Sequence, residues 1–209
     1  MNLKWRLRSF ISMILLKIYF PKVIFREINN STEIEKMHNL VWQIYGLEKK
    51  YFDVNQTSPK ILQDKYEKNS IKIGAFNGDN LIGALRIILP SSEGFYVEED
   101  FNVDLSSFPY DEIAEISRFV VLREYRKKLI SFGLWKKALE ISKMKKINYW
   151  IFVIPEKIKD YLSKSFGIKC YPIKTKELTE KQIKAREKMI NYYKNGNPAP
   201  YIIFLKELY

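Results

Sequence analysis

Three polar residues interrupt a segment that otherwise has the apolar pattern of a buried strand. Glu115, Ser117 and Arg118 lie within residues 113–122, whose other members are apolar. Burying such groups costs free energy unless they are paired or used. If these residues have a structural role, they form a buried ion pair. If they have a functional role, Glu115 is a catalytic carboxylate beside a guanidinium that orients a substrate. The strand pattern alone leaves both interpretations open.

The order of side chains along this strand limits how they can act together. Side chains alternate between the two faces of a strand, so Glu115, Ser117 and Phe119 would face one way and Arg118 the other. A site that contains both Glu115 and Arg118 therefore requires a β-bulge in the strand, or separate roles for the two faces.

The elements around this strand combine a hairpin with alternating strands and helices. Asn77-Gly78 predicts a hairpin turn, and Thr32 with Glu35 has the spacing of a helix capping box. Residues 90–111 are acidic and weakly periodic, which predicts a long surface excursion. Strands are expected at residues 23–28, 70–76, 81–89, 113–122, 148–154, 168–173 and 201–206, and helices at 32–45, 59–68, 131–144, 155–165 and 179–194. This order predicts a single α/β domain with a mixed, mostly antiparallel central sheet flanked by helices.

The charge of the chain is concentrated in its second half. Of 209 residues, 36 are Lys or Arg and 24 are Asp or Glu, which gives a formal charge of +12. Residues 123–194 hold 20 of the basic and only 7 of the acidic residues. Such asymmetry suits nucleic acid, an acidic partner protein or an anionic membrane, whereas a Lys-rich chain can also scatter solvated charge over its helices.

Cysteine and histidine are nearly absent, which excludes several kinds of site. Cys170 and His38 each occur once. The chain therefore has no intramolecular disulfide framework, no cysteine zinc site and no convincing nucleophile and base for a serine or cysteine hydrolase. We expect no metal and a reducing, cytoplasmic setting.

The first 22 residues form an amphipathic segment ahead of a domain that spans residues 23–209. An apolar run at residues 9–20 follows Lys4, Arg6 and Arg8. The run is shorter than the roughly 20 residues needed to cross a bilayer, and it lacks a signal-peptide cleavage site. We expect it to pack on the core or to lie at the periphery of the membrane, on its inner face.

Two motifs resemble those of a known family. They are Glu115-x-Ser117-Arg118-Phe119, with Tyr125-Arg126 downstream, and Gly83-x-Leu85-Arg86-x-x-Leu89-Pro90 upstream. In this order they resemble the acyl-homoserine-lactone synthases and the related N-acyl amino acid synthases of the GNAT superfamily of N-acyltransferases. The expected order of strands and helices also matches that superfamily from about residue 23 to 206.

The resemblance implies a role for each motif residue. It implies catalytic roles for Glu115 as general base, Ser117, and Tyr161 as the proton donor to a leaving thiolate. It implies that the amine substrate is bound by Arg86, Arg118 and Phe119, and the pantetheine arm of an acyl donor by Val120, Val121 and Leu122. A basic cluster would receive an acidic acyl carrier protein; its members are Arg123, Arg126, Lys127 and Lys128.

Two departures from the family pattern bear on the substrates. Leu129 stands where coenzyme A users have the first glycine of Arg/Gln-x-x-Gly-x-Gly/Ala, so we expect an acyl carrier protein thioester as cosubstrate, no cofactor, and less use of acyl-CoA. Val41 replaces an Arg of the first helix motif, which disfavours S-adenosylmethionine and favours an amino acid as the amine.

We therefore expect an N-acyltransferase that moves a fatty acyl group from acyl carrier protein to an amino acid or a related small amine. The alternatives are an acyl-homoserine-lactone synthase and a non-enzymatic basic module that binds nucleic acid. The sequence contains no zinc-finger, helix-turn-helix or RNP-type signature, so no nucleic-acid partner is expected.

Overall fold

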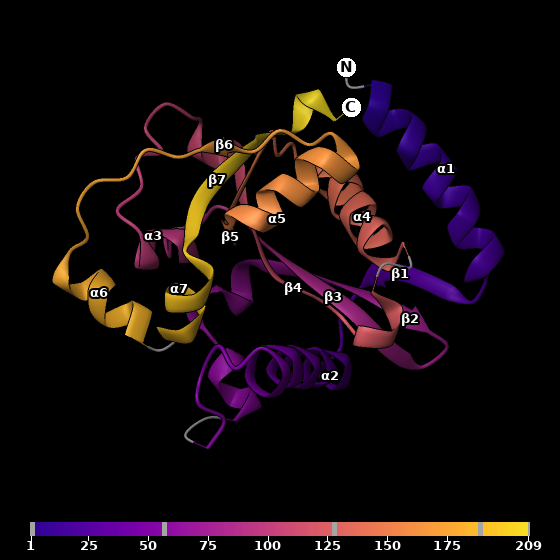
Figure 1. The fold of residues 1–209 in the computed structure, drawn as a ribbon, viewed down its shortest axis with the longest axis horizontal. Helices are drawn as coiled ribbons and strands as arrows, with labels where there is room; N and C mark the ends of the chain where they lie inside the picture. Colours follow the sequence, from indigo (N-terminus) through magenta and orange to yellow (C-terminus); the bar gives the residue numbers. More distant parts are fainter. Residues whose placement is uncertain (1–2, 56–57, 127–128, 188–189, 209) are drawn as a thin grey trace.

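The computed structural model describes residues 3–55, 58–126, 129–187 and 190–208. One seven-stranded sheet in the order β1-β2-β3-β4-β5-β7-β6 organises the chain (Figure 1). The strands are β1 (Val23–Glu27), β2 (Ser70–Asn77), β3 (Asn80–Ile88), β4 (Ile113–Val121), β5 (Tyr149–Pro155), β6 (Tyr171–Pro172) and β7 (Pro198–Phe204). Among the strands of the described residues, only β4 and β5 pair in parallel, so the expected mixed, mostly antiparallel sheet is confirmed.

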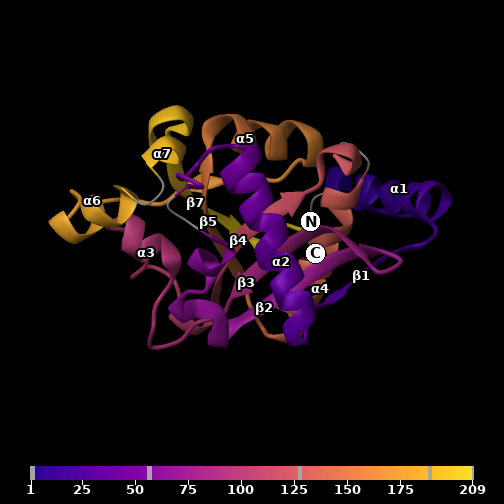
Figure 2. The ribbon, with the colours of Figure 1, turned by 90° about the horizontal axis from the view of Figure 1, so that it is seen from below.

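Helices cover both faces of the sheet. The α-helices are α1 (Leu3–Tyr19), α2 (Ser31–Trp42), α3 (Tyr96–Asp100), α4 (Ile130–Met144), α5 (Glu156–Tyr161), α6 (Glu180–Glu187) and α7 (Ile190–Gly196). On β3, Ala84 belongs to the core cluster under α2, whereas Leu85 belongs to the cluster under α4. Figure 2 shows α2 crossing one face of the sheet, with α4 behind it.

The parallel ladder between β4 and β5 is short. It runs from Ile113 opposite Tyr149 to Glu115 opposite Ile151, although β4 continues to Val121 and β5 to Pro155. β5 remains paired with β7 over this distance. The strands at the centre of the sheet thus part directly after Glu115.

The hairpin and the helix at 131–144 form as expected. β2 and β3 close around Gly78, whose φ of +59° is readily adopted only by glycine. The helix before them differs from the prediction at both ends. The N-cap is Asn30, whose side chain accepts a hydrogen bond from the Glu33 N–H at 2.9 Å, rather than Thr32. Asn is at least as good an N-cap as Thr. After Trp42 the helix continues as a π-helical turn, η1 (Gln43–Glu48).

Three further predictions of local structure are corrected. The strand expected at 168–173 is reduced to β6. The helix expected at 179–194 is represented by α6 and α7, on either side of residues 188–189, which lie outside the described residues. The helix expected at 155–165 is α5 followed by a second π-helical turn, η6 (Leu162–Phe166). The last strand begins three residues earlier than predicted, at Pro198, because its prolines lie where β6 does not pair and need donate no N–H there.

The excursion at 90–111 is more than a surface loop. It contains α3, and Phe95 and Val97 are fully buried in a second core cluster with strand residues such as Ile113 and Ile151. Its aromatic residues gain enough free energy from burial to hold the segment against the sheet.

Candidate active site

A β-bulge in β4 brings the three polar residues of the strand to one face. Ala84 pairs with Val120 and Arg86 with Ser117, so β4 has one more residue than β3 between these two pairs. The extra residue is Arg118, whose φ is +50°. Ser117 and Arg118 consequently both meet groups on the α2 side of the sheet, which resolves the alternation in favour of a shared site.

Glu115 is a buried carboxylate with an unusual pKa. It is 2% exposed, and its Oε2 accepts a hydrogen bond from the backbone N–H of Val97 at 3.1 Å. Burial raises its pKa from 4.5 to about 8, against the opposing effects of the Val97 hydrogen bond and the charge of Arg86. A carboxylate with a pKa near the working pH is suited to general base catalysis.

Arg86 and Arg118 meet acidic partners that come from the segment before β2. Arg86 Nη1 lies 2.8 Å from Asp64 Oδ1, and Arg118 Nη2 lies 2.8 Å from Asp64 Oδ2. Arg118 Nη1 lies 2.5 Å from Glu67 Oε1, and Arg118 also donates to the Leu62 carbonyl. The buried-ion-pair interpretation is therefore confirmed for Arg118, with partners other than Glu115.

Lys72 adds a third cation to the two arginines and two carboxylates just described. Lys72 Nζ lies 3.0 Å from Glu67 Oε2. Although burial alone would raise the pKa of Glu67, its contacts with His38 and Arg118 hold it well below its usual range. We call this set the arginine–acid cluster; its members are Arg86, Arg118, Lys72, Asp64 and Glu67.

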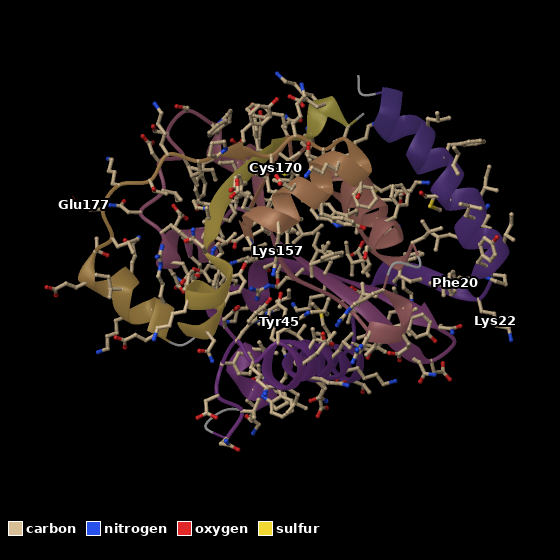
Figure 3. The ribbon with its side chains drawn as sticks, viewed as in Figure 1. Phe20, Lys22, Tyr45, Lys157, Cys170 and Glu177 are labelled. Atoms are coloured by element: carbon tan, nitrogen blue, oxygen red, sulfur yellow. The ribbon has the colours of Figure 1, made fainter. Side chains whose placement is uncertain are left out.

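Tyrosines from three distant elements surround these charges. Burial raises the pKa of Tyr45, while the positive charges of Arg118 and Arg86 act in the opposite direction. Figure 3 shows Tyr45 on the side of α2 that faces the sheet. Tyr96 of α3 has a raised pKa through burial and the nearby charges of Asp100 and Glu115. Aromatic rings therefore lie close to the charges of the cluster and of Glu115.

A third tyrosine ties this region to β5. The Tyr192 hydroxyl of α7 donates to the Val153 carbonyl at 2.9 Å, on the part of β5 that has parted from β4. Its ring packs on Tyr51 with centroids 4.8 Å apart, and Tyr51 in turn packs on Tyr45. Helix α7 thereby borders the gap in the parallel ladder.

The remaining predicted catalytic and substrate residues lie in different surroundings. The Ser117 hydroxyl accepts a hydrogen bond from Arg86 Nε at 2.8 Å, so it belongs to the site. Phe119 lies on the opposite face of the sheet, where its ring packs edge-on against Trp135. Tyr161 is half exposed at the end of α5 and packs against Phe166 of the second π-helical turn. The structure thus brings Ser117, but not Phe119, together with Glu115 and Arg118.

The residues predicted to bind the donor lie at the end of β4 and directly after it, a region we call the donor mouth. Val120 and Val121 are buried, and the Leu122 N–H donates to the Ile82 carbonyl at 2.9 Å. Arg123 is exposed, whereas Arg126 makes a two-point ion pair with Glu48 at 2.5 and 2.6 Å. Any carrier contact of Arg126 would compete with this pair. Lys127 and Lys128 lie outside the described residues.

A groove of about 300 Å³ opens beside this mouth. The first π-helical turn forms one wall, and the residues that follow β4 form the other. The lining residues are Gln43, Ile44, Leu47, Glu48, Leu122, Arg123 and Glu124. Its size is at the lower end of the range for small-molecule pockets.

Leu129 combines a glycine-like backbone with a leucine side chain. It precedes α4 with φ +65°, in the left-handed region, and its side chain packs partly buried on the main core. The chain therefore keeps the backbone conformation that a glycine favours while filling the space that a glycine would leave open.

Other chemistries find little support among the described residues. Burial raises the pKa of the Cys170 thiol to about 12, so a thiolate nucleophile is scarce near neutral pH. Within the described part of the chain, no group of three or more His, Cys, Asp and Glu side chains is arranged to hold a metal ion.

Sequence reasoning missed the acidic partners, His38 and the tyrosines. Asp64 and Glu67 lie about 50 residues before Arg118, in a short polar segment without a motif. One signal was available, because two arginines expected in buried strands require carboxylates from elsewhere. Two acids spaced by three residues just before β2 would have been candidates.

Solved structures with a similar fold include an N-acyl amino acid synthase and acyl-homoserine lactone synthases. The chain aligns with FeeM from uncultured soil microbes at a TM-score of 0.62 and 16% identity, covering 89% of this chain and 92% of that one. It aligns with BjaI, a CoA-dependent acyl-homoserine lactone synthase, at a TM-score of 0.66 and 16% identity, covering 89% and 86%. The acyl-homoserine lactone synthase LasI aligns at 0.63 and 15%, covering 88% and 90%. At these identities the likeness shows the fold.

The sequence comparison identifies the family. No curated protein matches the chain. The family model "N-acyl amino acid synthase FeeM" matches residues 36–172, which is more than half of the chain and includes the bulged strand, Arg86 and the carboxylates of the cluster. Acetyltransferases of the GNAT family share the fold as well. The chain therefore belongs to the FeeM family of N-acyl amino acid synthases, and it is an N-acyltransferase with a GNAT fold.

Proposed function

We propose that this N-acyltransferase transfers a fatty acyl group from an acyl carrier protein thioester to the amine of an amino acid. The observation that carries the proposal is the bulge in β4, which places the Glu115 carboxylate and the arginine–acid cluster on one face beside the end of the parallel ladder. Acylation of an amino acid requires a base for the amine, and cationic side chains can hold the carboxylate of the amino acid.

The expected reaction assigns a proton transfer to each end of the thioester. Ionised Glu115 takes a proton from the amine, directly or through water, and the amine nitrogen attacks the thioester carbonyl carbon. The tetrahedral intermediate then breaks its C–S bond, and the thiolate leaves with a proton from Tyr161. The products are an N-acyl amino acid and the free thiol of the carrier.

The charge balance of the site supports an amino acid as the acceptor. Counted without Glu115, the arginine–acid cluster contains three cations and two carboxylates, which leaves one positive charge to attract a substrate carboxylate before Glu115 ionises. S-adenosylmethionine would add a sulfonium charge to an already cationic site, which is unfavourable in a buried setting. Tyr45 and Tyr96 offer aromatic surfaces for an apolar or aromatic amino acid side chain.

Two features of the donor mouth support a carrier protein. The partly buried side chain of Leu129 occupies the position where coenzyme A users have a glycine that lets backbone N–H groups approach a pyrophosphate. Exposed Arg123 beside the groove would attract an acidic carrier. The CoA dependence stated for BjaI makes the donor the point that the assay must decide.

The test is a direct assay with both donors. Purified protein is incubated with acyl carrier protein thioesters or with matching acyl-CoA, together with a mixture of amino acids or S-adenosylmethionine, and N-acyl products are identified by mass spectrometry. We expect acylated amino acids from the carrier donor and loss of product in Glu115→Gln. Lactone products would favour the synthase alternative, and no product from any pair would overturn the proposal.

A further inference from the structure

Helix α1 has two apolar faces, only one of which packs on the protein. Leu16 is 3% exposed and belongs to the main core cluster, where Met13 and Phe20 pack against it. These contacts hold α1 against α4 at the edge of the molecule, as Figure 1 shows. Burial of this inward face stabilises the packed helix, so the apolar residues on its outward face are not needed to hold it in place.

The outward face is an apolar stripe. Its members follow the helical spacing of three, four, seven and eleven residues after the first, and their exposed fractions lie between 43% and 66%. We call it the α1 stripe; it consists of Leu7, Phe10, Ile11, Ile14 and Ile18. Five exposed large apolar residues on one helix face indicate a surface that meets an apolar phase.

Basic residues accompany this stripe along the helix. Lys17 is exposed within α1, and Lys22 lies exposed beyond its C-terminal end, as Figure 3 shows. By sequence, positions 4, 6 and 8 are also basic, and residues 1–28 hold 6 basic residues and 1 acidic residue. The helical repeat of about 100° places Lys17 at the edge of the stripe, on the side of Phe10.

We propose that α1 lies flat in the interfacial region of a membrane that contains anionic lipids. An apolar stripe on a segment with an excess of Lys and Arg is the pattern of an interfacial helix, because the apolar side chains enter the acyl boundary while Lys and Arg reach the headgroups. A second copy of the chain is a poorer occupant, since pairing two stripes would bring two segments of like net charge together. Within the described residues, none of the helices has the length and apolarity of a membrane span.

Vesicle sedimentation tests this proposal with the full chain. The protein is mixed with sucrose-loaded vesicles of phosphatidylcholine alone or of phosphatidylcholine with phosphatidylglycerol. We expect binding to the mixed vesicles that weakens as salt is raised, and weaker binding to phosphatidylcholine. The double variant Phe10→Gln with Ile14→Gln should lower the partition coefficient by about tenfold or more, because each residue contributes buried apolar area to the bound state.

Matched variants separate the stripe from general effects. Met144→Gln on α4 and Ile183→Gln on α6 remove exposed apolar residues elsewhere and should leave binding unchanged. Lys17→Glu should weaken binding to the mixed vesicles only. The stripe residues are exposed, so the thermal midpoint of the double variant should match the wild type.

Three results would overturn the proposal. One is no sedimentation with either vesicle, and another is equal loss of binding in the stripe and control variants. The third is a dimer in sedimentation velocity that the stripe substitutions dissociate while vesicles bind neither protein. None of these readouts depends on acyl transfer, so the outcome is independent of the proposed enzymatic function.

Discussion

The guanidinium of Arg118 and the carboxylate of Glu67 lie 2.5 Å apart although 51 residues separate them in the chain. The contact exists because Arg118 occupies the bulge of β4 and turns toward the α2 side of the sheet. Both groups are largely withdrawn from water, and Asp64 holds Arg118 and Arg86 together. These ion pairs therefore hold the predicted substrate-binding arginines of β3 and β4 against the segment before β2.

Removal of Arg118 should destabilise the protein strongly. Arg118→Met removes a cation that balances the negative charges of Glu67 and Asp64. Breaking a buried ion pair in this way lowers the free energy of unfolding by about 3–5 kcal/mol. Arg126→Met is the matched control, because it breaks a more exposed pair with Glu48 and should cost about 1 kcal/mol or less. Urea unfolding measures both, and equal losses would show that the buried pair has no special weight.

The pH dependence of acyl transfer should report the ionisation of Glu115. The base must be ionised, and burial raises its pKa to about 8, so kcat/KM should rise with pH through this value. The kcat/KM of Glu115→Gln should be lower by about 10²–10⁴-fold, and its pH profile should show only the ionisation of the substrate amine. Glu112→Gln, just before β4, is the control and should retain the wild-type profile. A profile that is unchanged in Glu115→Gln contradicts the assignment.

The same carboxyl group should make stability depend on pH. The folded-state pKa of about 8 exceeds the ordinary 4.5, so the stabilising contribution is complete below pH 4.5 and is lost as pH rises toward 8. Over this window the wild type should lose stability relative to Glu115→Gln, by up to about 1.4 kcal/mol per pH unit. Denaturant midpoints for both proteins across the range measure the difference, and parallel curves would refute a raised pKa.

Leu129→Gly should shift donor preference toward acyl-CoA. The backbone is already at φ +65°, so glycine fits without rearrangement and removes the side chain at the donor mouth. We expect the ratio of acyl-CoA to carrier-protein activity to rise about tenfold. Leu129→Ala shortens the side chain but retains Cβ, and it should change the ratio less. An unchanged ratio in both variants would remove Leu129 from the donor argument.

Tyr161→Phe tests the predicted proton donor. The substitution keeps the ring that packs on Phe166 and removes only the hydroxyl. If the hydroxyl protonates the thiolate, kcat should fall about tenfold or more while the thermal midpoint stays unchanged. Tyr19→Phe, which removes an exposed hydroxyl on α1, provides the control. Wild-type kcat in Tyr161→Phe would leave this tyrosine a packing residue.

Local pattern was sufficient to predict most of the fold. The Asn77-Gly78 turn, the apolar strands and the helix at 131–144 each depend on neighbours within a few residues, so propensity and periodicity describe them well. The π-helical turns and α3 were not predicted. Their geometry depends on packing against distant strands, as the buried Phe95 and Val97 illustrate.

Residue types and their spacing were enough to predict that a carboxylate, a hydroxyl and a guanidinium share one strand, and to show that the second half of the chain is basic. Tertiary structure alone decided which of them meet. The bulge turns Arg118 to the face of Ser117 and leaves Phe119 against Trp135, and Asp64 and Glu67 arrive from a remote segment. Buried charges pair with whichever opposite charges the fold brings within hydrogen-bonding distance. The residues that meet are far apart in the sequence, so the local pattern of residue types does not predict their contact.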